Sequence, residues 1–405
     1  MNWISRKFLF VYKYSGKWIS KWMNQRRTKE DAEYRILLYC NSSTMEEHLV
    51  NYVEQTEDEG YHYYVFFGDR YPAGKRQPLE ETLFKNKKNI FSVRHMGKMF
   101  CSRWDLIVCA DLEPPFWMFK GTIPMLYIGH GISNVSYDGG KSAYDYGPES
   151  RDEDGRLIFD KILEPNKRVA KMLQDRDDEY KNAVRCTGYR FAGKIAKAQG
   201  RKDEYRISFG IDGSKPVVSF FGSWNKESLF HVLGKELFEV CDALSEKYTF
   251  IFSIHPIEYS RYSPDIEPMG ELVERQREKG HLVRSPKEDW VPYIMASDVV
   301  VADYSTMLSL AILAGKRVIL SDFPDTKICE YSLGYQVKKR FPVIGRAGEL
   351  EEALQKVLNV PEFKKVVEIY REELYVSEEE YKEKVSKITA DMIAEKRKRN
   401  SPCNS

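Results

Sequence analysis

Two histidines stand at places in the sequence where an imidazole could take part in chemistry. His130 lies between two glycines, directly after the apolar run PMLYI, and His255 precedes a proline, directly after YTFIFSI. Flanking glycines allow a sharp turn that leaves a side chain uncrowded, and proline, which has no N–H, suits the exit of a strand. An imidazole at either place can act as a general base near neutral pH. A structural role in a loop is the alternative for each histidine.

Hydroxyl and carboxylate side chains follow two further apolar runs. Asp303, Ser305 and Thr306 come between DVVVA and the apolar segment MLSLAILAG. Ser223 lies in a Gly-Ser turn after PVVSFF. Serine or threonine at a helix start is a typical N-cap, and the same end of a helix attracts anions. The pattern predicts a capped helix start that also binds a diphosphate.

Short apolar runs alternate with polar, helix-like stretches from residue 34 onward. Several runs are continuous rather than alternating, which is typical of strands buried on both faces of a parallel sheet. The stretches between them, such as 226–247 and 264–280, are long enough for crossover helices. We therefore predict two α/β domains of the doubly wound type, in which ligands bind at the carboxyl ends of the strands. The runs predicted as strands are 35–40, 63–67, 105–109, 124–129, 159–164, 216–221, 248–254, 281–284, 298–302 and 317–320.

The polar, glycine-containing segment KAQGRKDEYRISFGIDGSKP predicts a domain boundary near 190–215. We assign 30–195 to an N-terminal domain, 210–360 to a C-terminal domain and 361–405 to C-terminal helices and a tail. The segment 360–398, which is rich in Glu and Lys, predicts one or two exposed helices. The final residues, KRKRNSPCNS, predict a frayed tail.

Charge is distributed unevenly along the 405 residues. The net charge of +2 argues against a polycation built for nucleic acid, yet residues 1–29 contain eight Lys or Arg and no Asp or Glu. In WISRKFLFVYKYSGKWISKWM, aromatic residues and lysines recur at helical spacing, a pattern typical of a helix in a membrane interface. Docking of this helix on the protein's own surface is the alternative. No apolar run reaches the ~20 residues of a spanning helix.

The order of these motifs resembles that of the CDP-glycerol glycerophosphotransferase family, the teichoic-acid primases and polymerases of bacterial envelopes. The resemblance covers roughly residues 105–335. It implies a GT-B fold, in which an acceptor domain and a nucleotide-donor domain of Rossmann type face a cleft. The motifs that carry it are His130-Gly131, Gly188-Tyr189, FFGSW, His255-Pro256, SDVVVADYST (297–306), Gly315-Lys316 and DFPDTKICEY (322–331).

The resemblance also implies an activity. A polyol phosphate would pass from a CDP-activated donor to a hydroxyl of a membrane-linked lipid or polysaccharide acceptor, on the cytoplasmic face of the bacterial cell membrane. His130 would remove the proton of that hydroxyl, and His255 would contact the donor's phosphates. No metal and no cofactor is implied. Ser305, Thr306, Asp303 and Ser223 would lie at the donor diphosphate, and Gly131 and Ser133 on the acceptor side.

The surroundings of His130, IGHGISNVSYDGGKSAYDYG, differ from the family's usual pattern, so the acceptor is not identified.

Three other functions stay open. A GT-B glycosyltransferase with a UDP- or CMP-type sugar donor would use the same strand-end residues. An isomerase similar to the sugar-nucleotide 2-epimerases has the same architecture, but its additional acidic residues are not evident. A catalytically inactive scaffold would have lost the histidines or the Ser/Thr pair, which this chain retains.

Overall fold

The computed structural model forms two compact units, each described by itself. Unit 1 comprises the described residues of Met1–His130, Tyr146–Arg190 and Glu378–Ser405, and unit 2 those of Gly131–Asp145 and Phe191–Ser377. The chain thus changes unit after His130, after Asp145, after Arg190 and after Ser377. The structure describes residues 33–68, 79–87, 89–93, 95–111, 119–132, 136–137, 141–142, 150–152, 154–224, 226–259, 265–322, 333–359 and 363–400.

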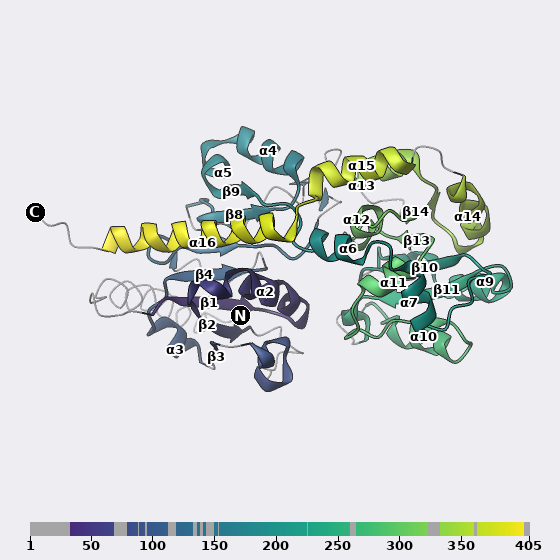
Figure 1. The fold of residues 1–405 in the computed structure, drawn as a ribbon, viewed down its shortest axis with the longest axis horizontal. Coiled ribbons are helices and arrows are strands. Elements are labelled where there is room, and N and C mark those ends of the chain that lie inside the picture. The colour runs from purple at the N-terminus through teal and green to yellow at the C-terminus, as the bar shows by residue number, and fades with distance from the viewer. Residues whose placement is uncertain are drawn as a thin grey trace, which may run out of the picture. The chain divides into compact units, whose positions relative to one another are not determined.

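Unit 1 is built on a seven-stranded parallel sheet in the order β3-β2-β1-β4-β5-β8-β9 (Figure 1). The strands β4 and β5 are buried along their whole length, as expected for apolar runs covered on both faces. The elements of this unit are β1 Arg35–Cys40, α2 Ser43–Thr56, β2 His62–Phe67, β3 Ile90–Val93, α3 Met96–Phe100, β4 Leu106–Cys109, β5 Met125–Tyr127, β8 Lys161–Glu164, α4 Lys167–Arg176, α5 Asp178–Ala183, β9 Val184–Cys186 and α16 Glu378–Asn400.

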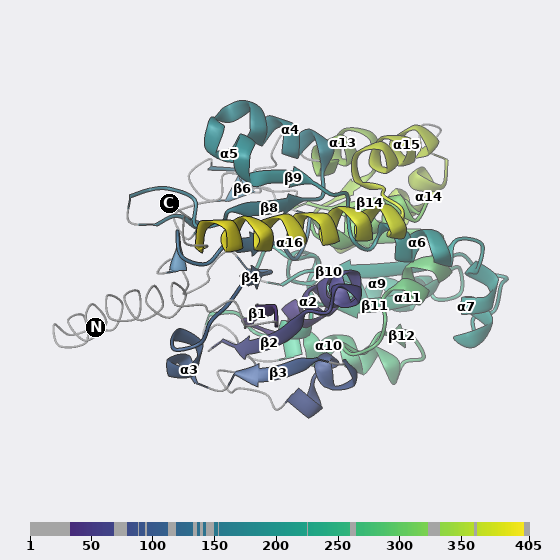
Figure 2. The same ribbon diagram turned by 60° about the vertical axis from the view of Figure 1, so that its left-hand side comes forward.

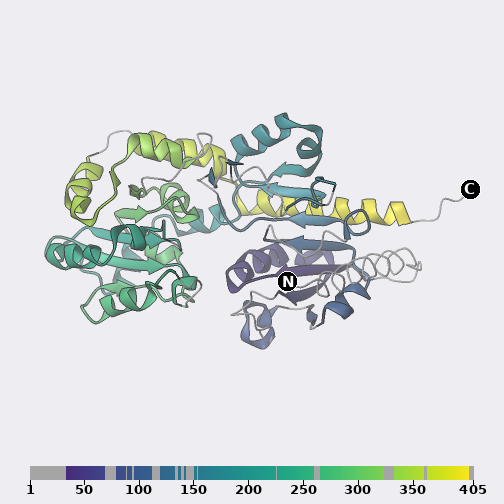
Figure 3. The same ribbon diagram turned by 180° about the vertical axis from the view of Figure 1, so that it is seen from behind.

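Unit 2 is built on a six-stranded parallel sheet in the order β12-β11-β10-β13-β14-β15 (Figure 3). A two-stranded antiparallel ribbon, β6–β7, also belongs to it. The elements are β6 Ser136–Tyr137, β7 Lys141–Ser142, α6 Ala192–Ala198, α7 Lys202–Ser208, β10 Val217–Gly222, α8 Leu229–Leu233, α9 Glu236–Leu244, β11 Thr249–Ile254, α10 Gly270–Glu274, β12 Leu282–Val283, α11 Val291–Ala296, β13 Val299–Ala302, α12 Thr306–Leu313, β14 Arg317–Ser321, α13 Leu333–Arg340, β15 Val343–Ile344, α14 Leu350–Leu358 and α15 Phe363–Leu374.

Both sheets follow the same doubly wound plan. The first strand of each unit lies inside its sheet, two strands are added on one side, and the later strands are added on the other. The order therefore reverses between β1 and β4 in unit 1 and between β10 and β13 in unit 2. All ten strands predicted from the sequence are present, and the predicted doubly wound α/β architecture is confirmed. The sequence did not predict β3, β9, β15 or the ribbon β6–β7.

An aspartate precedes three of the strands and ties each to its neighbour. Its carboxylate accepts a hydrogen bond from the first N–H of the adjacent strand. Asp105, before β4, binds the N–H of Arg35 at 2.8 Å. Asp298, before β13, binds the N–H of Val217 at 2.7 Å. The third is Asp160, before β8, which binds the N–H of Met125 at 2.9 Å. These bonds satisfy strand ends and fix the register at the amino edge of each sheet.

The C-terminal helices are packed rather than exposed, which corrects the prediction for 360–398. In unit 1, α16 lies along α2 and β4 (Figure 2). Thr389, which is fully buried, shares a 3.0 Å hydrogen bond with the hydroxyl of Tyr52. Residues 396–400 are helical instead of frayed, and the Lys396 ammonium donates to the carbonyl of Trp104. Few apolar positions are needed because polar side chains of α16 find buried partners.

The basic aromatic segment 1–29, predicted to lie in a membrane interface, falls outside the described residues. Within the described part of the chain, every helix is too short or too polar to cross a bilayer.

Substitution of Asp298 tests whether the hydrogen bonds at the strand ends stabilise the fold. Besides the N–H of Val217, it binds Lys202 at 2.5 Å and Arg206 at 2.6 Å. Burial raises the pKa of this carboxyl, but the bonds from Lys202, Val217 and Arg206 outweigh burial, and its pKa is lowered. We expect Asp298→Ala to reduce the free energy of unfolding by about 1.5–3 kcal/mol at pH 7, measured by urea denaturation.

The pH dependence of that loss has a defined sign. A carboxyl whose pKa is lower in the folded chain stabilises it above the unfolded value of about 3.9 and loses this effect as the pH falls through the folded pKa. The difference between the wild type and Asp298→Ala should therefore shrink below about pH 4. A difference that is independent of pH would contradict the assigned charge.

Candidate functional site

The residues predicted to do chemistry lie at the carboxyl edges of the two sheets. In doubly wound sheets, ligands bind at this edge, beside the point where the strand order reverses. In unit 2, Ser223 follows β10, His255 follows β11 and Asp303 follows β13. In unit 1, His130 follows β5. The structure therefore gives each unit its own set of polar strand-end residues.

Asp303 organises the strand-end loops of unit 2. Its side chain is 3% exposed, and its Oδ2 accepts three hydrogen bonds: from the N–H of Ser223 at 2.7 Å, from the Ser223 hydroxyl at 2.8 Å and from the N–H of Leu229 at 3.1 Å. These bonds join the loop between β10 and α8 to the end of β13. The expectation that Asp303 orients a loop thus has a geometric basis. The Ser223 hydroxyl donates its single proton to Asp303.

The start of α12 contacts the segment that begins at Gly131. The Thr306 Oγ1 accepts a hydrogen bond from the N–H of Ile132 at 2.9 Å. A Cβ atom on Gly131 would lie 2.5 Å from the same oxygen, so only glycine permits this approach. Thr306 uses a lone pair here, and its hydroxyl proton is still available to a ligand oxygen. Gly131, expected on the acceptor side, therefore lies against a residue expected at the donor diphosphate.

Ser305 occupies the N-cap position of α12, but its side chain makes no capping hydrogen bond. The first-turn contact is instead a backbone bond from the N–H of Leu308 to the Ser305 carbonyl. The expectation of a side-chain cap is therefore wrong. Since the Ser305 hydroxyl does not cover the N–H groups at this helix end, the positive end of the helix dipole is not screened by a cap.

The two histidines are held in opposite tautomers. The Nδ1 of His130 lies 2.9 Å from the carbonyl of Ala110, and because a carbonyl only accepts, this nitrogen carries the proton. The lone pair of a neutral His130 is then on Nε2. The Nδ1 of His255 accepts from the N–H of Ile257 at 3.2 Å, so a neutral His255 carries its proton on Nε2. His130 thus presents an acceptor and His255 a donor.

The surroundings of the two rings differ as well. His130 is exposed and follows Gly129, whose φ of +67° is in the left-handed region that favours glycine. His255 is half-buried, and its ring centroid lies 6.4 Å from that of Trp224, which is 43% exposed. An exposed tryptophan at a strand end offers an apolar surface beside the polar groups of unit 2.

Sequence reasoning missed a buried contact between a glutamate and a histidine near His255. Glu258 has no exposed surface and accepts a hydrogen bond from the N–H of Met269 at 3.0 Å. The Nε2 of His231, on α8, lies 3.1 Å from the same carboxylate. This pair ties the turn after β11 to α8. A single Glu within HPIE gives no sequence signal, because its partner is 27 residues away.

Sequence reasoning also missed the polar partners around His130 in unit 1. The ring of His48, on α2, lies 6.4 Å from the His130 ring. Arg190 donates to His48 Nδ1 at 2.6 Å and to the carbonyl of Gly129 at 2.9 Å. The signal in the sequence was Arg190 itself, a charged residue that follows the Gly188-Tyr189 motif after β9.

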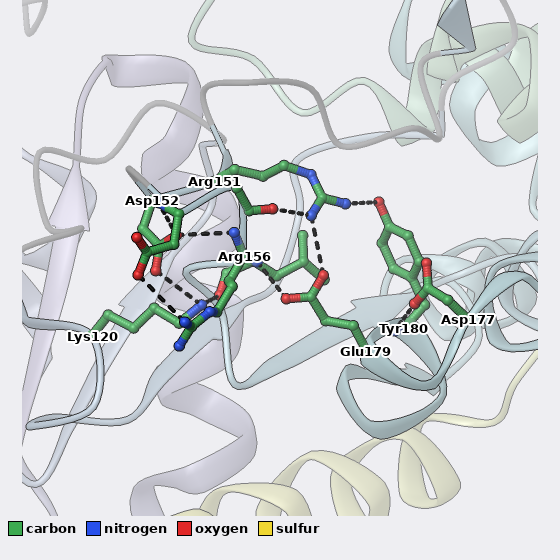
Figure 4. Close-up of polar contacts among 10 residues, drawn as sticks. Lys120, Arg151, Asp152, Arg156, Asp177, Glu179 and Tyr180 are labelled. Atoms are coloured by element: carbon green, nitrogen blue, oxygen red, sulfur yellow. Dashed lines mark hydrogen bonds and ion pairs between the residues drawn. The ribbon is translucent and has the colours of Figure 1, made fainter.

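A different charged cluster of unit 1 surrounds Arg151 (Figure 4). Arg151 binds the Glu179 carboxylate at 3.1 Å and the Tyr180 hydroxyl at 2.8 Å. The Lys120 ammonium lies 3.4 Å from Asp152. Because Lys120 precedes β5 and the segment 150–157 precedes β8, the cluster belongs to the amino edge of the sheet. Its groups satisfy one another, and we assign it to stability.

Some expectations fall outside the described residues, including those for Ser133 and for 323–331 of DFPDTKICEY. Among the residues that are described, no group of three or more His, Cys, Asp or Glu side chains could hold a metal ion.

The contact between Gly131 and Thr306 can be tested by stability measurements. We expect Gly131→Ala to lower the free energy of unfolding by about 1–3 kcal/mol, because the new methyl group overlaps Thr306 Oγ1. Thr306→Ala removes that atom, so it should cost less in the Gly131→Ala background than in the wild type. Urea denaturation of the four proteins gives the comparison, and equal costs in both backgrounds would refute the contact.

Several solved structures resemble this chain in fold. The wall teichoic acid polymerase TagF, in a form soaked with CDPG, matches with a TM-score of 0.64 at 11% identity, over 98% of this chain and 100% of that one. A glycosyltransferase from Rickettsia africae matches with a TM-score of 0.51 at 13% identity, over 89% of this chain and 99% of that one.

A putative UDP-N-acetylglucosamine 2-epimerase from Listeria monocytogenes matches with a TM-score of 0.55 at 12% identity, over 90% of this chain and 98% of that one. No protein-family model matches the sequence, and no curated protein matches it significantly. At these identities the likeness shows a shared fold, the one found in TagF and in GT-B glycosyltransferases.

Proposed function

We propose that this protein transfers a polyol phosphate, glycerol phosphate or a similar group, from a CDP-activated donor to a hydroxyl of a membrane-linked acceptor. The acceptor is a lipid or polysaccharide of bacterial teichoic acid or surface polysaccharide synthesis. The observation that carries the proposal is the pair of strand-end histidines in opposite tautomers, one with a free acceptor nitrogen and one with a donor N–H. The fold shared with TagF and the motif order favour the CDP-linked donor.

On the acceptor side, the proposal assigns His130 as the general base. Its Nε2 lone pair takes the proton of the acceptor hydroxyl as the oxygen attacks the phosphorus that bears the polyol. The new bond joins this oxygen to that phosphorus, and the bond to the bridging oxygen of the diphosphate breaks. A phosphodiester forms, CMP leaves with the bridging oxygen, and the proton stays on His130.

On the donor side, the proposal assigns His255 and the start of α12 to the diphosphate. The Nε2–H of His255 donates to a phosphate oxygen and stabilises the charge that develops on CMP. The N–H groups and dipole of α12 attract the phosphates, and the hydroxyls of Ser305 and Thr306 add hydrogen bonds. Asp303 and Ser223 keep the β10–α8 loop in place beside them.

A glycosyltransferase with a UDP- or CMP-type sugar donor is the second candidate. The fold is shared with the Rickettsia africae glycosyltransferase, and the same base and diphosphate site would serve a sugar donor. An epimerase is the third, since the Listeria protein has the same fold. The identity of the donor separates the three.

Transfer itself is the direct test of the proposal. We expect the protein to release CMP from CDP-glycerol or CDP-ribitol in the presence of a hydroxyl acceptor, and His130→Ala to lower this turnover by about 100-fold or more. CDP-glycerol should bind to His130→Ala as tightly as to the wild type, because His130 is assigned to the acceptor. Normal turnover by His130→Ala would remove His130 from the mechanism.

The protein is further proposed to act as a peripheral protein on the inner face of the cell membrane. The eight basic residues of 1–29 and its tryptophans carry this part of the proposal. Deletion of 1–29 should release the protein from anionic vesicles in a sedimentation assay. Equal binding of the shortened and full chains would place the membrane contact elsewhere.

A further inference from the structure

One arginine contacts both the backbone before His130 and the imidazole beside it. Arg190 Nη1 donates to the carbonyl of Gly129 at 2.9 Å, and its Nη2 donates to the carbonyl of Ile128. The same guanidinium donates to Nδ1 of His48 at 2.6 Å. A single side chain from the segment after β9 thus connects the loop after β5 with α2.

The bond from Arg190 determines the tautomer of His48. An imidazole nitrogen that accepts a hydrogen bond carries no proton, so a neutral His48 has its proton on Nε2. Burial, together with the positive charge of Arg190 and the neighbouring His130, lowers the pKa of His48 well below its usual value. His48 is therefore uncharged at neutral pH, with its ring 6.4 Å from that of His130 and inclined by 66°.

We propose that Arg190 is a positioning residue for His130, acting through the carbonyls of Ile128 and Gly129 and through His48, whose tautomer it fixes. The inference rests on the proposed function, in which His130 takes a proton. Fixed carbonyls keep the turn that presents His130, and a neutral His48 avoids like-charge repulsion when His130 becomes an imidazolium.

The three acceptors explain why the residue is an arginine. The guanidinium presents five N–H donors in a planar fork, whereas a lysine ammonium is a flexible point charge. Two carbonyls and one imidazole nitrogen around one side chain match the fork. Arg190→Lys keeps the charge but should recover little of the effect, which distinguishes positioning from simple electrostatics.

Arg151 provides a matched control in the same unit. It also binds three acceptors, namely the carbonyl of Gly155 at 2.6 Å, the Glu179 carboxylate and the Tyr180 hydroxyl (Figure 4). It differs from Arg190 in lying at the amino edge of the sheet. Arg151→Gln should therefore reduce stability without changing the chemistry.

Kinetics of the full chain form the first arm of the test. We expect Arg190→Gln and Arg190→Lys to lower kcat for transfer about 100-fold, as displaced catalytic groups do, while the KM for the donor changes less than about twofold. Arg151→Gln should keep the wild-type kcat. An unchanged kcat in Arg190→Gln, or an equal loss in Arg151→Gln, would overturn the inference.

Nuclear magnetic resonance of 15N-histidine-labelled protein forms the second arm and needs no turnover. At about pH 5.5, where an ordinary histidine is mostly charged, His48 should be neutral with its proton on Nε2 in the wild type. In Arg190→Gln, the Nδ1 of His48 loses its donor, so His48 should no longer hold this tautomer. At about pH 8, His130 should no longer hold a single neutral tautomer in this variant. A charged His48 in the wild type, or unchanged spectra in Arg190→Gln, would overturn the inference.

The two arms separate the two claims. If the wild type transfers no polyol phosphate from any CDP donor but the spectra change as expected, the proposed function fails and the role of Arg190 stands. If transfer proceeds but Arg190→Gln leaves kcat and both tautomers unchanged, the role of Arg190 fails and the proposed function stands.

Discussion

The carboxylate of Asp303 is the interaction on which the polar edge of unit 2 depends. It sits at the reversal of strand order and accepts three hydrogen bonds from the loop after β10. A carboxylate with 3% exposure would be very costly without such partners. Its bonds therefore fix the conformation of Ser223 and the start of α8, while its own strand leads within two residues to Ser305.

Unit 1 repeats this arrangement with different residues. Asp111 follows β4 and accepts a 3.1 Å hydrogen bond from the amide of Asn41, which follows β1. At the opposite edge, Asp105 and Asp298 bind the first N–H of the neighbouring strand in their respective units. The strand beyond the reversal thus carries an aspartate at both ends in each sheet. Both sheets therefore have the same doubly wound plan, with an aspartate before and after the strand beyond the reversal. This shared plan explains how two unrelated stretches of sequence build equivalent sheet edges.

Local pattern predicted the central strands because burial on both faces requires apolar runs such as DVVVA and RILLYC. The missed strands β3, β9 and β15 lie at sheet edges and are short, so they need fewer buried residues and leave a weaker pattern. The packing of α16 was missed for a different reason: its contacts to unit 1, such as that of Thr389 with Tyr52, join residues that are far apart in sequence.

The sequence likewise predicted only part of the candidate site. Strand-end position identified His130, His255 and Asp303, because parallel strands bring their carboxyl ends to one edge. The tautomers of the histidines depend on Ala110 and Ile257, and the Arg190–His48 contact spans 142 residues, so neither could be predicted from local sequence. Ser305 shows that a local signal can also mislead. Serine is a good N-cap residue type, yet its side chain makes no capping hydrogen bond at α12.

The most direct test of the central claim is a thermal-shift comparison of CDP, CDP-glycerol and CDP-ribitol with UDP and UDP-sugars. A ligand that binds only the folded state raises its stability with concentration, so the account predicts a higher Tm with the CDP compounds and little change with the UDP compounds. Stabilisation by UDP compounds alone, or by none of them, would contradict the proposed donor.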